Sequence, residues 1–173
     1  CARNWGTRWL ATIFGIVFGV RSGIRPGSRM DRALTVASAS MLAVPGFVLA
    51  MLMVIVFAVQ LGWFEPTGYS WPSEDGWFAW LRSITLPSIA LSLPMIAVVQ
   101  RQLRSSMSAA LQSRYVLAAR ARGVPAGTIV RRHAMRNAMI PTVTVIGFQA
   151  SNAIGLTIAV EQIFAIPGAG SLL

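Results

Sequence analysis

The arginines between residues 100 and 132 are the side chains of this chain best suited to binding another molecule. The segment carries no Asp or Glu, and Arg114, Arg120 and Arg122 lie close together within it. Their guanidinium groups can bind the acidic residues of a partner protein or the phosphates of lipid headgroups. These residues alone leave the two alternatives about even, because a basic loop needs no particular spacing to touch anionic lipid.

The sequence indicates no other kind of chemistry. Cys1 is the only cysteine, which excludes an intrachain disulfide and a thiolate metal site. His133 is the only histidine and lies among arginines, with no second metal ligand nearby. There is no Gly-x-x-x-x-Gly-Lys-Ser/Thr phosphate loop and no His-Glu-x-x-His zinc motif. We therefore expect no metal site, no cofactor bound by this chain and no enzyme activity.

Two helices are expected to position the arginines. Residues 108–122 contain good helix formers and no helix breaker. Gly123 then ends this first helix, and Pro125 suits the first turn of a second helix over 126–138. The two helices would form an elbow at Gly123. If the chain lies in a membrane, as its composition indicates below, this elbow would place the helix over 108–122 across the membrane plane.

The first of these helices has features of a docking surface. Ala118, Ala119 and Ala121 have little bulk, so a partner could come close. Leu111 and Tyr115 are four residues apart, so they are expected to share one helix face as an apolar anchor.

The composition places the chain in a membrane. Hydrophobic residues make up 55% of its 173 residues, the mean hydropathy is +0.62, and only 12% are charged. A soluble domain would carry about a quarter charged residues. The net charge of +10 could suggest nucleic-acid binding. We reject that function, because the arginines cluster in loops between apolar runs.

The apolar runs predict an all-α, polytopic membrane helix bundle forming a single domain. A run of about 20 residues is enough to cross the hydrocarbon. The predicted spans are about 9–20 (short and so truncated), 33–61, 84–104 and 138–160. A loop at about 62–83 connects the second and third spans, and a loop at about 105–137 connects the third and fourth. Pro45, Gln149, Ser151 and Asn152 are candidates for a substrate pathway, since polar groups in spans prefer the bundle interior.

The distribution of arginine predicts the orientation. Twelve of the fifteen arginines fall in loops on one side of the predicted spans, which is assigned as cytoplasmic. The loop at 62–83 lies on the other side and is rich in Trp and Tyr, as expected at an outer membrane interface. The basic loop at 105–137 therefore faces the cytoplasm of a multi-pass protein in the cell (inner) membrane.

At this loop the chain resembles a known family. The segments Arg114-Tyr-Val-Leu-Ala-Ala-Arg-Ala-Arg-Gly-Val-Pro125 and Arg132-His-Ala-Met-Arg-Asn-Ala-Met-Ile-Pro141 are similar to the coupling loop of ABC-importer permeases. The similarity is closest to the dipeptide, oligopeptide and nickel group. The segment Val160-Glu-Gln-Ile-Phe-Ala-Ile-Pro-Gly-Ala-Gly170 resembles the segment of that group before its last span. The family pattern begins Glu-Ala-Ala-x-x-x-Gly, and Leu117 stands here in place of the Glu.

The resemblance implies a half-pore subunit whose cytoplasmic helix sits in a cleft of an ATP-hydrolysing subunit. ATP would be used by that partner and not by this chain. Further expected partners are a second homologous permease subunit, an extracytoplasmic solute-binding protein and membrane lipid. A complete member would have additional spans at both ends, so a fragment is expected. The docking residues it implies are Tyr115, Ala118, Ala119, Arg120, Arg122 and Gly123.

The expected function is inward transport of peptides or a similar small solute. Nickel or another small solute is an alternative cargo. A channel or scaffold protein without ATP coupling is the alternative of a different class.

Overall fold

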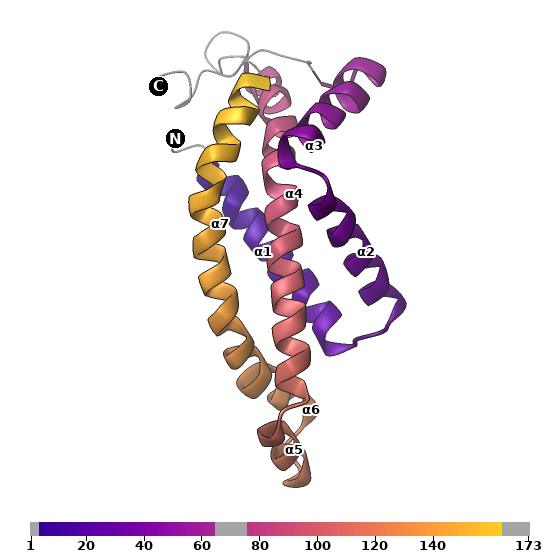
Figure 1. The fold of residues 1–173 in the computed structure, drawn as a ribbon, viewed down its shortest axis with the longest axis vertical. Coiled ribbons are helices and arrows are strands. Elements are labelled where there is room, and N and C mark those ends of the chain that lie inside the picture. Colours follow the sequence, from indigo (N-terminus) through magenta and orange to yellow (C-terminus); the bar gives the residue numbers. More distant parts are fainter. Residues whose placement is uncertain (1–3, 65–75, 164–173) are drawn as a thin grey trace.

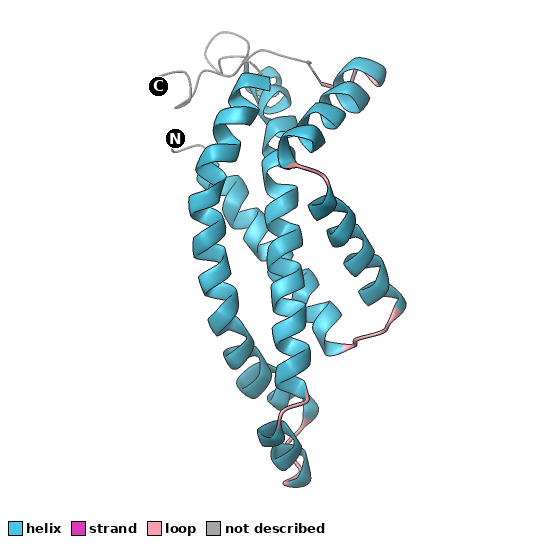
Figure 2. Cartoon of the chain, viewed as in Figure 1, coloured by secondary structure: helices cyan, strands magenta, loops and turns pink. Residues whose placement is uncertain are grey.

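The computed structural model describes residues 4–64 and 76–163, including the side chains of 10–64, 76–152 and 163. All regular structure in these ranges is helical, which confirms the predicted all-α fold (Figure 2). The helix α4 (Gly76–Leu111) runs through the middle of the bundle and contacts α1, α2, α3 and α7 (Figure 1).

The first helix, α1 (Asn4–Ile24), packs against α4 through Gly15, Gly19 and Gly23. A Cβ atom added at Gly19 would lie only 2.8 Å from the Cβ of Leu103. A Cβ atom added at Gly15 or Gly23 would lie 2.9 Å or 2.6 Å from the nearest side chain of α4. Glycine every fourth residue lets two helix backbones approach closely, as is common between membrane helices. This glycine face therefore fixes the packing of α1 on α4.

The stretch predicted at 33–61 as one span is bent. It consists of α2 (Arg29–Ala43), α3 (Gly46–Met53) and the π-helical segment η1 (Val54–Gln60). The two arms meet at an angle of 101° at Pro45, which follows Val44 in an extended conformation. A residue before proline disfavours the α-helical conformation, which explains why the helix breaks here.

The helix α4 continues beyond both ends of the span predicted at 84–104. It contains Pro87 and Pro94 and ends seven residues after the predicted boundary. The reason is packing: Met107 is fully buried in a cluster with Ala134 and Ala138, so this part of α4 has its own core. The end of an apolar run does not mark the end of a helix.

The basic loop is largely helical. Its elements are α5 (Arg114–Ala121), α6 (Ala126–Thr128), the π-helical segment η2 (Ile129–Ala134) and then α7 (Met135–Ile163). The last three follow one another without a gap, so the second arm of the predicted elbow runs directly into the predicted span at 138–160. The predicted continuous helix over 108–122 is wrong, because α4 ends at Leu111 and α5 starts at Arg114.

By length and composition, α4 can cross a membrane, and the bent pair of α2 with α3 and η1 is a second candidate if it counts as one span. The predicted truncated span at 9–20 falls in α1, whose apolar part is Leu10–Ile24. The number of crossings and their orientation stay predictions. Part of the predicted outer aromatic segment, residues 65–75, lies outside the described residues.

Candidate functional site

The short helix α5 lies at one end of the molecule, beyond the end of α4 (Figure 1). Ser113 separates the two helices: its backbone is extended, with φ −70° and ψ 153°, and its hydroxyl donates a hydrogen bond to the Ala110 carbonyl at 2.5 Å. Serine is favoured at the residue that precedes a helix. The chain therefore turns at Ser113, and α5 is a separate helix rather than the continuation of α4.

The end of α5 is fixed by Gly123, as predicted. Gly123 has φ +76°, a conformation that side chains other than glycine disfavour. The Val124 N–H donates to the Ala119 carbonyl at 3.1 Å, and the Gly123 N–H donates to the Arg120 carbonyl at 2.9 Å. These two hydrogen bonds form a Schellman motif, which satisfies the last carbonyls of the helix. The glycine therefore sets the angle between α5 and the segment that leads to α7.

One face of α5 packs on its own chain. Val116 and Ala119 are at most 1% exposed and form a cluster with Ile129, against which Leu111 and Val124 also pack. This cluster attaches α5 to the end of α4 and to η2. This packing links the position of α5 to the positions of α4 and η2.

The expectation that Ala119 belongs to an exposed surface of small residues is wrong. Its side chain is 1% exposed and faces the chain's own core, whereas Ala118 and Ala121 are exposed. The reason is helix periodicity: Val116 and Ala119 are three residues apart and share the inner face. Ala118 is therefore open to contact from outside the chain, and Ala119 is not.

The opposite face of α5 is exposed and combines apolar with basic side chains. Leu117 is 54% exposed and Tyr115 is 39% exposed. The Tyr115 hydroxyl accepts a hydrogen bond from Asn137 Nδ2 at 2.8 Å, which orients the ring against the start of α7. We call this surface the outer face of α5, and its exposed residues are Arg114, Tyr115, Leu117, Ala118, Arg120, Ala121 and Arg122.

The predicted anchor of Leu111 and Tyr115 is also wrong. Leu111 is the last residue of α4 and packs in the inner cluster, while Tyr115 belongs to α5. The break at Ser113 separates them, so the spacing of four residues has no meaning here. The exposed apolar residue beside Tyr115 is Leu117. In the sequence, Leu117 was notable only because it stands in place of the family's glutamate.

The outer face carries positive charge that no described acidic side chain pairs with. Asp31 is the only acidic residue whose side chain the structure describes, and it pairs with Arg104. Arg114, Arg120 and Arg122 form no ion pair with a described residue. Guanidinium groups held at a surface in this way are available to carboxylates or phosphates. Within the described residues, no three His, Cys, Asp or Glu side chains are grouped as a metal site would require.

The candidate pathway residues come from two parts of the fold. Pro45 is exposed at the bend before α3, and Gln149, Ser151 and Asn152 lie on α7. The Ser151 hydroxyl donates to the Gly147 carbonyl at 3.4 Å, within its own helix. No hydrogen bond in the described part of the chain joins Pro45 to the other three. The structure thus leaves the proposed pathway as a prediction.

Sequence reasoning missed two contacts that organise the bundle. The glycine face of α1 was visible as a repeat of Gly15, Gly19 and Gly23 at intervals of four residues. The second contact is the ion pair of Asp31 with Arg104, which joins residues 73 positions apart. The only indication of this ion pair in the sequence was that Asp31, three residues after Ser28, is an acidic residue among arginines. The Ser28 hydroxyl accepts a hydrogen bond from the Asp31 N–H and so caps α2.

Comparison with known proteins identifies a family for this chain. Residues 12–173 match the family described as the binding-protein-dependent transport system inner membrane component. This match covers almost the whole chain and includes every element described above except the first eight residues of α1. Members of this family are components of transport systems and not enzymes.

Curated relatives have similar descriptions. A putative peptide transport system permease protein of Brucella abortus is 44% identical over 131 residues, which are 76% of this chain and 41% of the relative. The glutathione transport system permease protein GsiC of Pectobacterium atrosepticum is 36% identical over 173 residues, 100% of this chain and 52% of the relative. GsiC of Escherichia coli K12 is 37% identical over 163 residues, which are 94% of this chain and 50% of the relative. The chain spans about half the length of the relatives it matches, and it belongs to the binding-protein-dependent transport system inner membrane component family.

Proposed function

We propose that this chain is part of a permease subunit that moves peptides inward across the cytoplasmic membrane in an ATP-driven importer. In this proposal α5 is the helix onto which an ATP-hydrolysing subunit docks. The observation that carries the proposal is the division of α5 into two faces. Its inner face is fixed to α4 and η2, and its outer face is exposed and both apolar and basic.

The composition of the outer face favours a protein partner over lipid headgroups. Tyr115 and Leu117 are exposed beside Ala118, where a partner can approach the helix backbone. Exposed apolar side chains next to small and basic ones suit a protein cleft lined with carboxylates. A surface that only touches headgroups requires the arginines alone. Of the implied docking residues, Tyr115, Ala118, Arg120 and Arg122 would contact the partner, while Ala119 and Gly123 hold α5 in place.

The rest of the assembly follows from the same proposal. A second homologous permease subunit would complete the pore, and an extracytoplasmic solute-binding protein would deliver the solute. Relatives are described as transporting peptides and glutathione, and glutathione is itself a short peptide. We therefore propose short peptides as the cargo and Pro45, Gln149, Ser151 and Asn152 as residues of its pathway. This chain would bind no cofactor, because ATP is bound and hydrolysed by the partner.

Charge reversal on the outer face distinguishes protein docking from lipid binding. In the full-length permease, Arg120→Glu combined with Arg122→Glu is expected to reduce co-purification of the ATP-hydrolysing subunit roughly tenfold, since like charges then oppose each other. Arg21→Glu combined with Arg25→Glu makes the same change in net charge at exposed positions outside α5 and serves as the control. The measurement is the ratio of the two subunits after purification in detergent.

Binding to phosphatidylglycerol vesicles is measured in parallel. If both double variants keep the ATP-hydrolysing subunit and lose only vesicle binding, α5 is a lipid contact and the docking proposal is wrong.

A further inference from the structure

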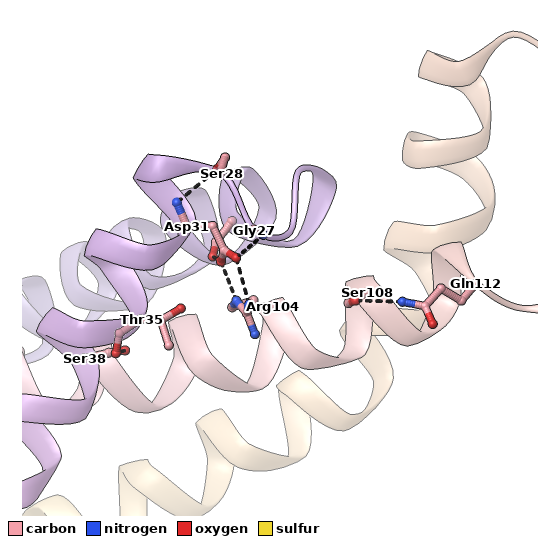
Figure 3. Close-up of polar contacts among 9 residues, drawn as sticks. Gly27, Ser28, Asp31, Thr35, Ser38, Arg104, Ser108 and Gln112 are labelled. Carbon is pink, nitrogen blue, oxygen red and sulfur yellow. Dashed lines mark hydrogen bonds and ion pairs between the residues drawn. The ribbon is translucent and has the colours of Figure 1, made fainter.

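A buried carboxylate joins three helices of this protein. The Asp31 side chain is 1% exposed, although it lies near the start of α2. Its Oδ2 accepts hydrogen bonds from Arg104 Nη2 at 2.8 Å and from the Gly27 N–H at 2.7 Å. Its Oδ1 accepts from Arg104 Nε and from the Ser22 hydroxyl. Figure 3 shows Arg104 reaching from α4 to the Asp31 carboxylate beneath the turn at Gly27.

The donors come from different elements. Ser22 belongs to the last turn of α1, Gly27 to the connection between α1 and α2, and Arg104 to α4. A buried carboxylate is tolerated only when opposite charge and hydrogen bonds replace the water it has lost. The bidentate geometry with arginine is the strongest form of such a contact. Asp31 thus attaches the end of the α1–α2 hairpin to α4.

Little else attaches α2 to the bundle. Asp31 and Ser38 are its only buried residues in the described structure. One turn along from the ion pair on each helix, Thr35 Oγ1 and the Gln100 carboxamide are buried and have no hydrogen-bond partner among the described residues. The described part of α2 therefore buries no large apolar side chain. The ion pair is the contact that fixes both the distance and the orientation of α2 relative to α4.

The ion pair lies on the path from α5 to the bent arm. Arg104 is two turns before the end of α4 at Leu111, after which the chain turns into α5. At its other end, α2 leads to the 101° bend at Pro45. A movement imposed on α5 can reach α4 through the buried cluster of Val116 and Ala119, and can reach α2 through Arg104.

We infer that Asp31 and Arg104 are positioning residues that transmit the movement of the docking helix to the α1–α2 hairpin. Rigid-body movement of packed helices requires contacts that hold their relative positions in both states. The ion pair is such a contact, because it fixes distance and orientation together. This inference rests on the proposed function of α5.

The test measures solute transported per ATP hydrolysed in the full-length permease, reconstituted with its ATP-hydrolysing and solute-binding subunits. Arg104→Gln is expected to lower this ratio roughly fivefold or more while ATP hydrolysis continues. Arg104→Lys keeps the positive charge and is expected to recover much of the ratio. Arg101→Gln, at an exposed position one turn earlier on α4, is the matched control and is expected to leave it unchanged.

A purely structural role gives a different pattern. A single neutral variant leaves the other charge unpaired, so Asp31→Asn with Arg104→Gln is measured as well, together with the unfolding midpoint of each variant. A double variant that folds normally and still transports poorly per ATP supports the inference. A normal ratio in the double variant, or in Arg104→Gln, overturns it. The ATP-hydrolysing subunit is expected to stay bound in all these variants, and its co-purification is measured alongside. Loss of transport per ATP with the subunit still bound is therefore distinguished from a failure of docking at α5.

Discussion

Replacing Gly123 with valine in the full-length permease is expected to uncouple ATP hydrolysis from solute uptake. Gly123 has φ +76°, and a β-branched residue in this conformation costs roughly 1–2 kcal/mol. A Cβ atom at this position meets no other atom within 4 Å, so the cost lies in the backbone and not in a clash. The ratio of the native α5 orientation to other orientations then falls roughly 5- to 30-fold, and uptake per ATP is expected to fall with it.

Gly123→Asn is the matched control, because asparagine adopts positive φ more readily than other residues. It is expected to retain most of the uptake, with Gly123→Val far below it. Uptake and ATP hydrolysis are measured together in proteoliposomes that contain the whole transporter. Uptake by Gly123→Val equal to that of the unmodified protein would show that the angle at Gly123 does not matter for transport.

Replacing Gly19 with leucine is expected to destabilise the bundle. The new Cβ atom would lie 2.8 Å from Leu103 Cβ and 3.0 Å from the Gln100 carbonyl oxygen, and a backbone carbonyl cannot rotate away. Helices α1 and α4 must separate to admit the side chain. Overpacking of this kind costs about 1–3 kcal/mol, and the loss of close contact along α1 adds to it. The unfolding midpoint of the purified permease should fall accordingly.

Gly147→Leu in α7 is the matched control for this prediction. Nothing lies within 4 Å of a Cβ atom at Gly147, and leucine favours helix more than glycine does. This variant is expected to keep or slightly raise the midpoint. Equal midpoints for the Gly19 and Gly147 variants would mean that the close approach of α1 and α4 does not contribute to stability.

The features predicted correctly from the sequence are those encoded locally. Apolar runs predicted an all-α fold, and glycine at position 123 predicted the end of a helix because few other residues adopt positive φ. Both features depend on neighbouring residues alone, so no knowledge of the tertiary structure was required.

The division of the basic loop into helices could not be predicted in the same way. Residues 108–122 are all compatible with helix, and Ser113 breaks the run because the chain turns there to pack Val116 and Ala119 on Ile129. The exposure of Ala118 and the burial of Ala119 follow from that packing. Identical residues side by side in the sequence give no indication of which one faces the core.

The ion pair of Asp31 with Arg104 was hidden for a different reason. The charges are 73 residues apart, and Arg104 is one of many arginines near the predicted cytoplasmic side. Only the antiparallel packing of α2 on α4 selects it as the partner of Asp31 (Figures 1 and 3). Long-range polar pairs of this kind depend on helix register, which apolar runs do not determine.

The most direct test of the docking role of α5 is site-specific cross-linking in intact cells. Cysteine is introduced at Ala118 or at Ala119 of the full-length permease, whose other cysteines are replaced, and a short cross-linker is added. The exposed position 118 is predicted to capture the ATP-hydrolysing subunit, and the buried position 119 to capture it far less. Capture at neither position, or equally at both, would contradict docking through the outer face of α5.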